Sequence, residues 1–385
     1  MLETNLIKER YKEIFGQEAA LLVKSPGRIN IIGEHTDYNE GFVLPAAIDK
    51  AIYVAVGKRE DDLISLYAED FKQSYSVKLV DIAPTSEGWP NYILGVVQQI
   101  KDKGLGIGGF NLYIDGDIPL GAGLSSSAAV ECATGYALNA LFQLDLDRVT
   151  IAKMGQLAEH TYAGVMCGIM DQFASVLSKA DHVIKLDCRD LSYTYVPLNL
   201  GNYEIVLLNT NVKHALASSA YNDRRNACEH AVRLIQAEYP EVKSLRDVNL
   251  NQLELYVKPV DPEAYVKSKY VIEENDRLSK ACQALEKGDI EELGRQMFLA
   301  HAAISEEFQV SCPELDFLVE QAKSFSQVKG ARMMGGGFGG CTINIVEKGF
   351  AAQLVEKLSP SYQAQFNLEL TPIFVSIANG TELVY

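Results

Sequence analysis

Four side chains suited to binding or transforming a small polar ligand lie close together near the start of the chain. Arg28, Glu34, His35 and Asp37 fall within ten residues of the segment 26–45, PGRINIIGEHTDYNEGFVLP. An apolar run precedes the charged residues, and glycines and prolines surround them, which predicts a short strand ending in a tight loop. Hydrogen-bonding groups on a stiff loop suit a small, hydroxyl-rich ligand, although a solvated turn after a strand has the same composition.

A glycine- and serine-rich segment, PLGAGLSSSAA at 119–129, has the features of an anion-binding loop. Its glycines let the backbone approach an anion, and the helix expected from Ser125 onward directs unpaired N–H groups toward it. The segment is not a Walker A loop, because the Gly-Lys-Ser/Thr ending is missing. It is not a dinucleotide fingerprint, because Ser126 occupies the third glycine position. A serine-capped helix after a glycine turn is the structural alternative.

Two carboxylates, Glu159 and Asp171, lie twelve residues apart in predicted helices. Glu159 falls in a predicted helix, and Asp171 opens the next one within CGIMDQF at 167–173. Taken alone, an Asp at a helix start is most often a cap, and a Glu in an amphipathic helix is usually solvated. In phosphoryl transfer, however, one carboxylate can hold magnesium while another accepts the proton of the attacking hydroxyl.

A third glycine-rich segment, MMGGGFGGCT at 333–342, contains GxGxxG spacing at Gly335, Gly337 and Gly340. A helix-like stretch is expected before it and a strand after it, the reverse of the order in a dinucleotide-binding fold. A protein-kinase glycine loop is excluded, because the chain has no HRD or DFG motif. We predict a glycine-rich turn into a strand and assign it no chemistry.

The composition narrows the class of protein. A chain of 385 residues suggests about two domains, and its formal net charge is −16. That charge argues against nucleic-acid or anionic-membrane surfaces, and no apolar run approaches the ~20 residues of a membrane span. Seven scattered cysteines, never in a CxxC pair, fit reduced thiols. We therefore expect a cytoplasmic protein that binds neither nucleic acid nor membranes.

The hydrophobic pattern favours an α+β fold over a doubly wound parallel sheet, because helices and strands segregate along the chain. Strands are expected at 20–24, 29–32, 42–45, 51–57, 63–68, 73–79, 109–115, 182–187, 193–197, 203–209, 341–346 and 371–377. Helices are expected at 5–15, 91–102, 125–141, 148–163, 169–178, 217–237, 273–287, 290–303 and 313–326. The pattern restarts near 190–205, which predicts domains at 1–200 and 201–385 with the ligand site between them.

These motifs together resemble one enzyme family. Segment 26–45 resembles the galactokinase signature, the first motif of the GHMP small-molecule kinases. Segment 119–129 is similar to the family's ATP-binding loop, PxGxGLSSSA, and GIMDQ at 168–172 is similar to the pattern around its proposed catalytic Asp. Segment 333–342 resembles the third family motif. The resemblance covers essentially the whole chain and implies a two-domain GHMP kinase fold with mixed and antiparallel sheets and an active site in the interdomain cleft.

The resemblance implies ATP-dependent phosphorylation of the C1 hydroxyl of α-D-galactose, the first committed step of galactose catabolism. The implied partners are D-galactose and ATP, with Mg²⁺ as the metal, and we expect a monomer. Asp171 would be the base, and Arg28 would stabilise charge on the transferring phosphoryl group. The implied sugar-binding residues are Glu34, His35, Thr36, Asp37, Gly168 and Tyr221. The implied phosphate loop is Gly121, Ala122, Gly123, Leu124, Ser125, Ser126 and Ser127, with magnesium held by Ser127 and Glu159.

Three alternatives stay open from the sequence. A kinase for a related sugar, such as N-acetylgalactosamine, arabinose or galacturonate, needs few changes in the sugar pocket. A galactose sensor without turnover would keep the fold, but the intact Ser127–Ala128 pair argues against it, because a fungal sensor related to the family lacks that pair. A GHMP kinase for a non-sugar alcohol is disfavoured by the Glu-His-Thr-Asp core at 34–37.

Overall fold

The computed structural model describes residues 4–212 and 217–384, and the strands within these ranges form three sheets. The largest sheet has the strand order β13-β1-β3-β6-β4-β5, antiparallel except for the β4–β6 pair. Its strands are β1 (Leu21–Asn30), β3 (Pro45–Lys58), β4 (Leu63–Ala68), β5 (Gln73–Lys78), β6 (Phe110–Gly116) and β13 (Glu382–Leu383).

The other two sheets are antiparallel throughout. One has the order β10-β11-β9-β12 and consists of β9 (Tyr203–Asn209), β10 (Val328–Met333), β11 (Cys341–Glu347) and β12 (Thr371–Phe374). The smallest consists of β2 (Phe42–Val43), β7 (His182–Asp187) and β8 (Tyr193–Pro197). Mixed and antiparallel sheets with segregated helices confirm the predicted α+β class.

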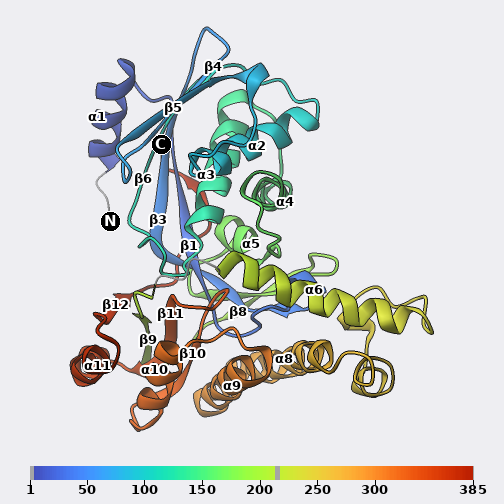
Figure 1. Cartoon of the computed structure of the whole chain (residues 1–385). Coiled ribbons are helices and arrows are strands. Elements are labelled where there is room, and N and C mark those ends of the chain that lie inside the picture. The colour runs from blue at the N-terminus through green and yellow to red at the C-terminus, as the bar shows by residue number, and fades with distance from the viewer. Residues whose placement is uncertain (1–3, 213–216, 385) are drawn as a thin grey trace.

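Helices cover both faces of the six-stranded sheet (Figure 1). On one face, α1 (Thr4–Phe15) packs Ile7 and Tyr11 against Leu22 of β1. Val23, the next residue, belongs to the main core on the opposite face, as the two-residue period of a strand requires. That face carries α2 (Pro90–Asp102), α3 (Ser126–Phe142), α4 (Arg148–Ala158) and α5 (Met170–Leu177).

In the second half of the chain, α9, α10 and α11 pack on the four-stranded sheet, and α6 and α8 lie beside them (Figure 1). These helices are α6 (Ala217–Gln236), α8 (Pro262–Lys287), α9 (Ile290–Ala303), α10 (Pro313–Lys323) and α11 (Ala351–Phe366). Short helical turns complete the described elements: Asp37–Asn39, Leu79–Asp81, Glu159–Ala163, Leu245–Asp247, α7 (Leu250–Gln252), Leu253–Val257 and Ile304–Phe308. None of the described helices combines the length and the apolar character that crossing a membrane requires.

The end of the chain returns to the sheet of the first half. β13 pairs with β1, and Ile377 pairs with Ile48. In Figure 1 the C-terminal end accordingly lies beside the six-stranded sheet. The division of the chain into domains at 1–200 and 201–385 stays a prediction.

Several elements differ from the sequence-based expectation. The stretch before the third glycine motif is not helical, because β10 leads directly into it and β11 follows, so the motif is the connection of a hairpin. The polar start of β10, with Lys329 and Gly330, conceals the alternation typical of a strand. α11 was not expected, and α8 begins at Pro262 rather than at 273.

The glycine at position 27 brings the phosphate loop against β1. The register of β1 against β3 shifts between Pro26 and Arg28. A Cβ on Gly27 would lie 2.7 Å from the carbonyl oxygen of Leu124, closer than side chains tolerate. The neighbouring Arg28 N–H donates to that same oxygen at 3.2 Å. Glycine therefore permits the contact that fixes the loop beside the strand.

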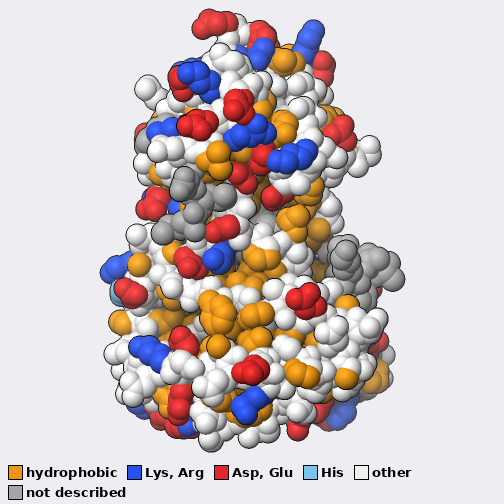
Figure 2. Space-filling model, turned by 90° about the vertical axis from the view of Figure 1, so that its left-hand side faces the viewer, with side chains coloured by type: hydrophobic (Ala, Val, Ile, Leu, Met, Phe, Trp, Pro, Cys, Tyr) orange, Lys and Arg blue, Asp and Glu red, His pale blue; other side chains and the backbone are white. Residues whose placement is uncertain are grey.

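The formal net charge of the chain is −16. On the face shown in Figure 2, acidic and basic side chains are interspersed among apolar ones. An anionic ligand on this face would be held by local groups rather than by a broad positive field.

Candidate active site

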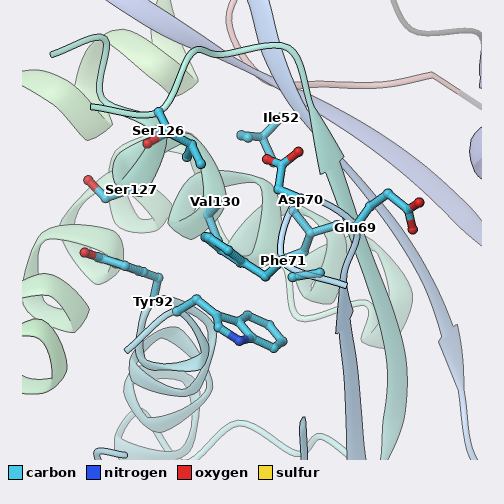
Figure 3. Close-up of a pocket in the computed structure, with 12 residues that line it drawn as sticks. Ile52, Glu69, Asp70, Phe71, Tyr92, Ser126, Ser127 and Val130 are labelled. Atoms are coloured by element: carbon cyan, nitrogen blue, oxygen red, sulfur yellow. The ribbon is translucent and has the colours of Figure 1, made fainter. Parts of the chain in front are cut away.

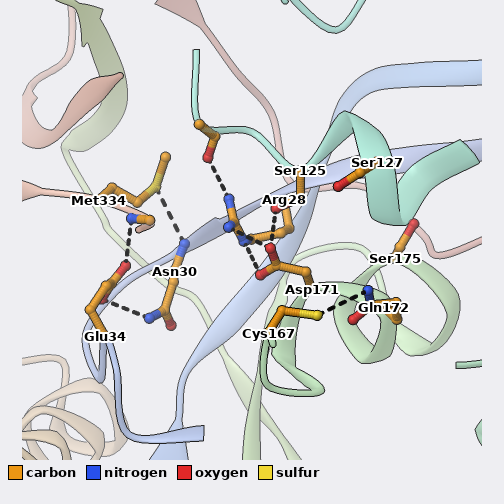
Figure 4. A network of polar contacts seen from close by, with 12 residues as sticks. Arg28, Asn30, Glu34, Ser125, Ser127, Cys167, Asp171, Gln172, Ser175 and Met334 are labelled. Carbon is orange, nitrogen blue, oxygen red and sulfur yellow. Dashed lines mark hydrogen bonds and ion pairs between the residues drawn. The ribbon is translucent and has the colours of Figure 1, made fainter. Parts of the chain in front are cut away.

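Arg28 and Asp171 form an ion pair at the centre of the site (Figure 4). Nε and Nη2 of Arg28 donate to Oδ1 and Oδ2 of Asp171 at 2.7 and 2.8 Å. Nη1 donates to the carbonyl oxygen of Gly123 in the phosphate loop at 2.6 Å. The arginine side chain is 5% exposed and the aspartate 27%. One buried guanidinium thus joins the loop to a carboxylate that still reaches the cavity.

Ser125 precedes α3 but does not cap it with its side chain. Its backbone is left-handed, with φ of 60°, and its Oγ donates to Oδ2 of Asp171 at 2.5 Å. The serine-capped helix expected from the sequence is therefore wrong at this position, because the backbone turns the hydroxyl toward Asp171. The first N–H groups of α3 do not donate to this side chain, as an anion site at a helix N-terminus requires.

In the rest of the phosphate loop, glycines with positive φ angles alternate with buried residues. Gly121 and Gly123 adopt φ of 73° and 74°, a conformation that glycine tolerates best. Ala122 and Leu124 are buried and hold the loop to the core. Ser126 and Ser127 follow as the first residues of α3. The backbone of the predicted phosphate loop is therefore bent and held around the start of this helix.

Glu159 and Ser127 meet beside the loop. Glu159 begins the helical turn after α4, and Ser127 Oγ donates to its Oε1 at 3.3 Å. Gln172 Nε2 donates to Glu159 Oε2 and to Oε2 of the buried Glu131, both at 2.9 Å. Burial, and then the charge of Asp171, raises the pKa of Glu159 to about 7. This buried acidic group would be stabilised by a nearby cation.

A hydroxyl and a carboxylate are donors that suit Mg²⁺, which usually keeps several water and phosphate ligands. Ser127 and Glu159 fit that ion through their oxygen atoms. Among the residues that the structure describes, no group of three or more His, Cys, Asp or Glu is arranged to hold a metal. A cation here would therefore depend on ligand oxygens as well as on the protein.

A small polar cavity of about 150 Å³ opens beside the ion pair, smaller than the ~300–1,000 Å³ typical of sites for drug-sized ligands. It brings together most of the predicted catalytic and sugar-binding residues. The lining consists of Arg28, Glu34, His35, Asp37, Glu159, Val165, Cys167, Gly168, Met170, Asp171, Tyr221, Gly335 and Gly336. Residues from both halves of the chain therefore form one cavity.

His35 is held as a neutral imidazole. Its Nδ1 lies 2.7 Å from the Tyr38 hydroxyl, and its Nε2 lies 3.2 Å from the carbonyl oxygen of Gly336. The carbonyl assigns the proton to Nε2, so Nδ1 accepts from Tyr38. Burial lowers the pKa of His35 to about 3. The rings of Tyr221 and Phe308 lie 5.0 and 4.9 Å from the imidazole, centroid to centroid.

Asp37 fits into the cavity because position 168 is glycine. A Cβ at Gly168 would collide with the Asp37 carboxylate. The Tyr38 backbone N–H donates to Asp37 Oδ1 at 3.0 Å. Burial, and then the charge of Asp171, raises the pKa of Asp37 to about 6. Two carboxylates therefore approach the same small space from different elements.

Of Glu34 and Thr36, only Glu34 lines the cavity. Glu34 lines the cavity, and it accepts from Asn30 Nδ2 at 2.8 Å and from the Gly335 N–H at 3.0 Å. Thr36 does not line the cavity; its hydroxyl donates to the carbonyl oxygens of Gly33 and Phe42 at 2.9 and 2.5 Å. Thr36 therefore holds the loop that carries its neighbours.

A second, largely apolar cavity of about 230 Å³ lies at the start of α3 (Figure 3). Ser126 and Ser127 line one edge of it, and Tyr92, Phe71 and Val130 lie opposite or beside them. Sequence reasoning missed this cavity, because its walls come from many short segments. The lining consists of Ile52, Ala68, Glu69, Asp70, Phe71, Trp89, Tyr92, Ile114, Leu120, Ser126, Ser127 and Val130.

The one available signal for the apolar cavity was Trp89, the only tryptophan in the chain, in a turn before a helix. Large aromatic side chains at partly exposed positions often serve ligands.

Comparison with known proteins identifies the class first. The chain matches models of the GHMP kinase N-terminal domain over residues 91–179 and of the GHMP kinase C-terminal region over 281–364. A mevalonate kinase shares the fold, with a TM-score of 0.67 at 19% identity, over 94% of this chain and 100% of the other. The fold and the glycine–serine loop are thus those of a GHMP kinase.

More specific matches narrow the class. The galactokinase galactose-binding signature matches residues 9–58. A galactokinase of Roseiflexus sp. is 40% identical over 94% of this chain and 92% of its own length. A galactokinase of Limosilactobacillus fermentum is 40% identical over 97% of both chains. The structure of Lactococcus lactis galactokinase complexed with galactose has a TM-score of 0.94 at 34% identity and covers 98% of this chain and 99% of the other. The chain belongs to the galactokinase family.

Proposed function

We propose that this kinase transfers the γ-phosphoryl group of ATP to the C1 hydroxyl of α-D-galactose and releases galactose 1-phosphate and ADP. The observation that carries the proposal is the arrangement of the polar cavity. The Arg28–Asp171 pair lies between the glycine–serine loop at 121–127 and a cavity that Glu34 and His35 line. Phosphoryl transfer needs mainly positioning and charge stabilisation, and this arrangement supplies both.

Asp171 acts in this proposal as the base that accepts the proton of the C1 hydroxyl. Its carboxylate lines the cavity and is oriented by the Arg28 fork and the Ser125 hydroxyl. Arg28, fixed on the Gly123 carbonyl as well, stabilises the negative charge that develops on the transferring group. Because both oxygens of Asp171 are held, the base is positioned before the substrate arrives.

The sugar hydroxyls bind, in this proposal, to Glu34, His35, Asp37, Tyr221 and the backbone of Gly168. His35 offers fixed hydrogen-bonding groups because burial keeps it neutral. A site of buried polar groups rejects a hydroxyl epimer by about 10⁴, because the groups are then left unpaired. Thr36 supports the loop from outside the cavity.

The nucleotide lies across the loop in this proposal. The backbone of residues 121–127 and the start of α3 hold the triphosphate. The apolar cavity, which Trp89 lines, receives the nucleobase. Ser127 and Glu159 hold Mg²⁺, which would neutralise phosphate charge. The nucleobase and the sugar would therefore occupy separate cavities.

We also propose a monomer of two domains, 1–200 and 201–385, in the cytoplasm. All seven cysteines are free, which supports a reducing compartment. Size-exclusion chromatography with light scattering tests the monomer directly.

The test of the proposed function is ADP release from MgATP by the purified protein. Galactose, glucose, N-acetylgalactosamine, arabinose and galacturonate are offered separately, with Asp171→Asn as the control. We expect release with galactose alone and its loss in the variant. Release with another sugar instead would contradict the substrate assignment, and galactose binding without any release would contradict the catalytic one.

A further inference from the structure

Arg332 is a buried cation that the sequence motifs do not single out. It lies in β10, and its side chain is 1% exposed. Its Nη2 forms an ion pair with Oε2 of Glu34, and its Nη1 donates to the carbonyl oxygen of Asn30 at 3.3 Å. Arg332 is absent from the cavity lining, whereas Glu34 is part of it. The arginine therefore contacts Glu34 from the side away from the cavity.

The Glu34 carboxylate is held at both oxygens. Oε2 meets Arg332 and accepts from Asn30 Nδ2 at 2.8 Å, and Oε1 accepts from the Gly335 N–H at 3.0 Å (Figure 4). A carboxylate this deeply buried needs a cation close by, because burial strongly disfavours an uncompensated charge. Burial, and then the charge of Arg28, lowers the pKa of Arg332 to about 9, so the guanidinium remains a cation at neutral pH.

The two strands that carry these groups also connect them to the reacting centre. Arg28 and Asn30 are two residues apart in β1 and therefore point to the same face of the strand. The Arg28 side chain donates hydrogen bonds to Asp171, whereas the Asn30 side chain donates one to Glu34. The backbone N–H of Asn30 also lies 3.4 Å from Sδ of Met334, which follows β10. Side chains of β1 thus contact both Asp171 and Glu34, and Arg332 of β10 also contacts Glu34.

We propose that Arg332 is a positioning residue for sugar recognition, which keeps Glu34 ionised and oriented so that it presents a fixed acceptor to one sugar hydroxyl. The inference rests on the proposed role of Glu34 as a sugar ligand. Without the guanidinium, the buried carboxylate would take up a proton or turn toward other partners. It would then offer a different hydrogen-bonding pattern to the sugar.

The test compares galactose and nucleotide affinities in Arg332→Met, Arg332→Lys, Glu34→Gln and the double variant that combines Arg332→Met with Glu34→Gln. Galactose affinity is measured by calorimetry with a non-hydrolysable ATP analogue present. Nucleotide affinity is measured by the fluorescence of Trp89, which lines the apolar cavity. We expect Arg332→Met to weaken galactose binding about 30-fold, as loss of a charged hydrogen-bond partner does, and nucleotide binding less than about twofold. Arg332→Lys, which keeps the charge but loses the fork, should weaken galactose binding about fivefold.

A matched control is Lys267→Met. Lys267 is another buried cation, but its Nζ donates to the Glu307 carbonyl oxygen and to Gln309 Oε1 rather than to Glu34. This variant should lower the melting temperature without lowering galactose affinity by more than about twofold. A general loss of packing would instead weaken galactose binding in both variants alike.

The double variant separates the two proposals. If Arg332 acts through Glu34, Arg332→Met adds almost nothing to the galactose loss already caused by Glu34→Gln. Additive losses, or an unchanged galactose affinity in folded Arg332→Met, would overturn the inference. If Arg332→Met does not fold, wild-type galactose affinity in Arg332→Lys would overturn it. Unchanged galactose affinity in Glu34→Gln, by contrast, would overturn the proposed sugar site itself.

Discussion

The polar cavity and the apolar cavity both lie near the phosphate loop, but their side chains are held in different ways. Arg28 of the polar cavity donates to Gly123 of the loop, whereas Ser126 and Ser127 of the loop line the apolar cavity. In the polar cavity, buried groups such as Glu34 and His35 already have protein partners at defined distances. In the apolar cavity, Phe71, Trp89 and Val130 offer contact area without a fixed hydrogen-bonding pattern. Held polar groups demand one arrangement of hydroxyls, whereas apolar contact accepts any flat ring of suitable size.

This difference teaches where selectivity should reside. Misplacing a hydroxyl in the polar cavity leaves buried groups unpaired, and each of these costs about 1–3 kcal/mol. Exchanging one purine for another in the apolar cavity changes few such contacts. We therefore expect the sugar to be selected far more strictly than the nucleobase.

The largest expected effect is this contrast in substrate preference. The value of kcat/KM should fall about 10⁴-fold from galactose to its C4 epimer glucose, because the buried partners lose their hydroxyl. It should fall only about tenfold from ATP to GTP, because base stacking tolerates changes in ring substituents. Steady-state kinetics with both pairs measure the two ratios. Equal ratios would contradict the comparison between the cavities.

The next effect removes the chemistry from the polar cavity. Asp171→Asn keeps the shape of the side chain but should lower kcat by about 10²–10⁴, the contribution of a positioned base. The Arg28 fork then faces a neutral amide, so galactose affinity should change much less than kcat. Single-turnover kinetics separate binding from transfer. A kcat within about threefold of the wild type would remove Asp171 from the proton transfer.

The contrast also explains which parts of the molecule the sequence predicted. The residues of the polar cavity lie in short motifs with distinctive types, so the sequence alone indicates Arg28, Asp171 and most of the other polar residues that line it. The hydrogen bond from Ser125 to Asp171 was missed, because a left-handed backbone angle cannot be read from residue type. The α+β class and most elements followed from hydrophobic periodicity.

The apolar cavity and Arg332 were missed for a different reason. The cavity is assembled from single apolar residues of separate strands, helices and loops, and each residue alone is typical of a core. Arg332 meets Glu34 across 298 positions of the chain, and the strand that carries it was taken for part of a helix-like stretch. Pairings between distant segments leave no local signal in a single sequence.

A tenfold effect is expected at Glu159, which lines the polar cavity and titrates near neutral pH. Because burial raises its pKa to about 7, the ionised fraction falls about tenfold between pH 8 and pH 6. Metal ligands must be deprotonated, so the affinity for Mg²⁺ should fall about tenfold over that range. Calorimetric titration with Mg²⁺ in the presence of a non-hydrolysable ATP analogue measures this change.

The same titration predicts stability without magnesium. A carboxyl group whose pKa is raised in the folded state favours folding when protonated, so this contribution is lost as the pH rises from about 4.5 to 7. Glu159→Gln should remove that loss of stability and should make the affinity for Mg²⁺ less dependent on pH. The pH dependence that remains in this variant comes from the titration of the nucleotide itself. Glu291→Gln, at an exposed glutamate paired with Lys329, serves as the control. An unchanged pH profile in Glu159→Gln would exclude Glu159 as the source.

An effect of similar size is expected in the apolar cavity. Trp89→Ala removes a large aromatic surface and should raise the KM for ATP about tenfold, in line with ~1–3 kcal/mol for stacking on one base. Trp89→Phe keeps an aromatic face but loses the hydrogen bond from Nε1 to Gln73 Oε1, so the KM should rise only about twofold. Neither change touches a group of the polar cavity, so kcat and the KM for galactose should stay within about twofold of the wild type. Steady-state kinetics at varied ATP and galactose concentrations test both statements. A rise in the KM for galactose that matches the rise in the KM for ATP would show that the two cavities do not bind their ligands independently.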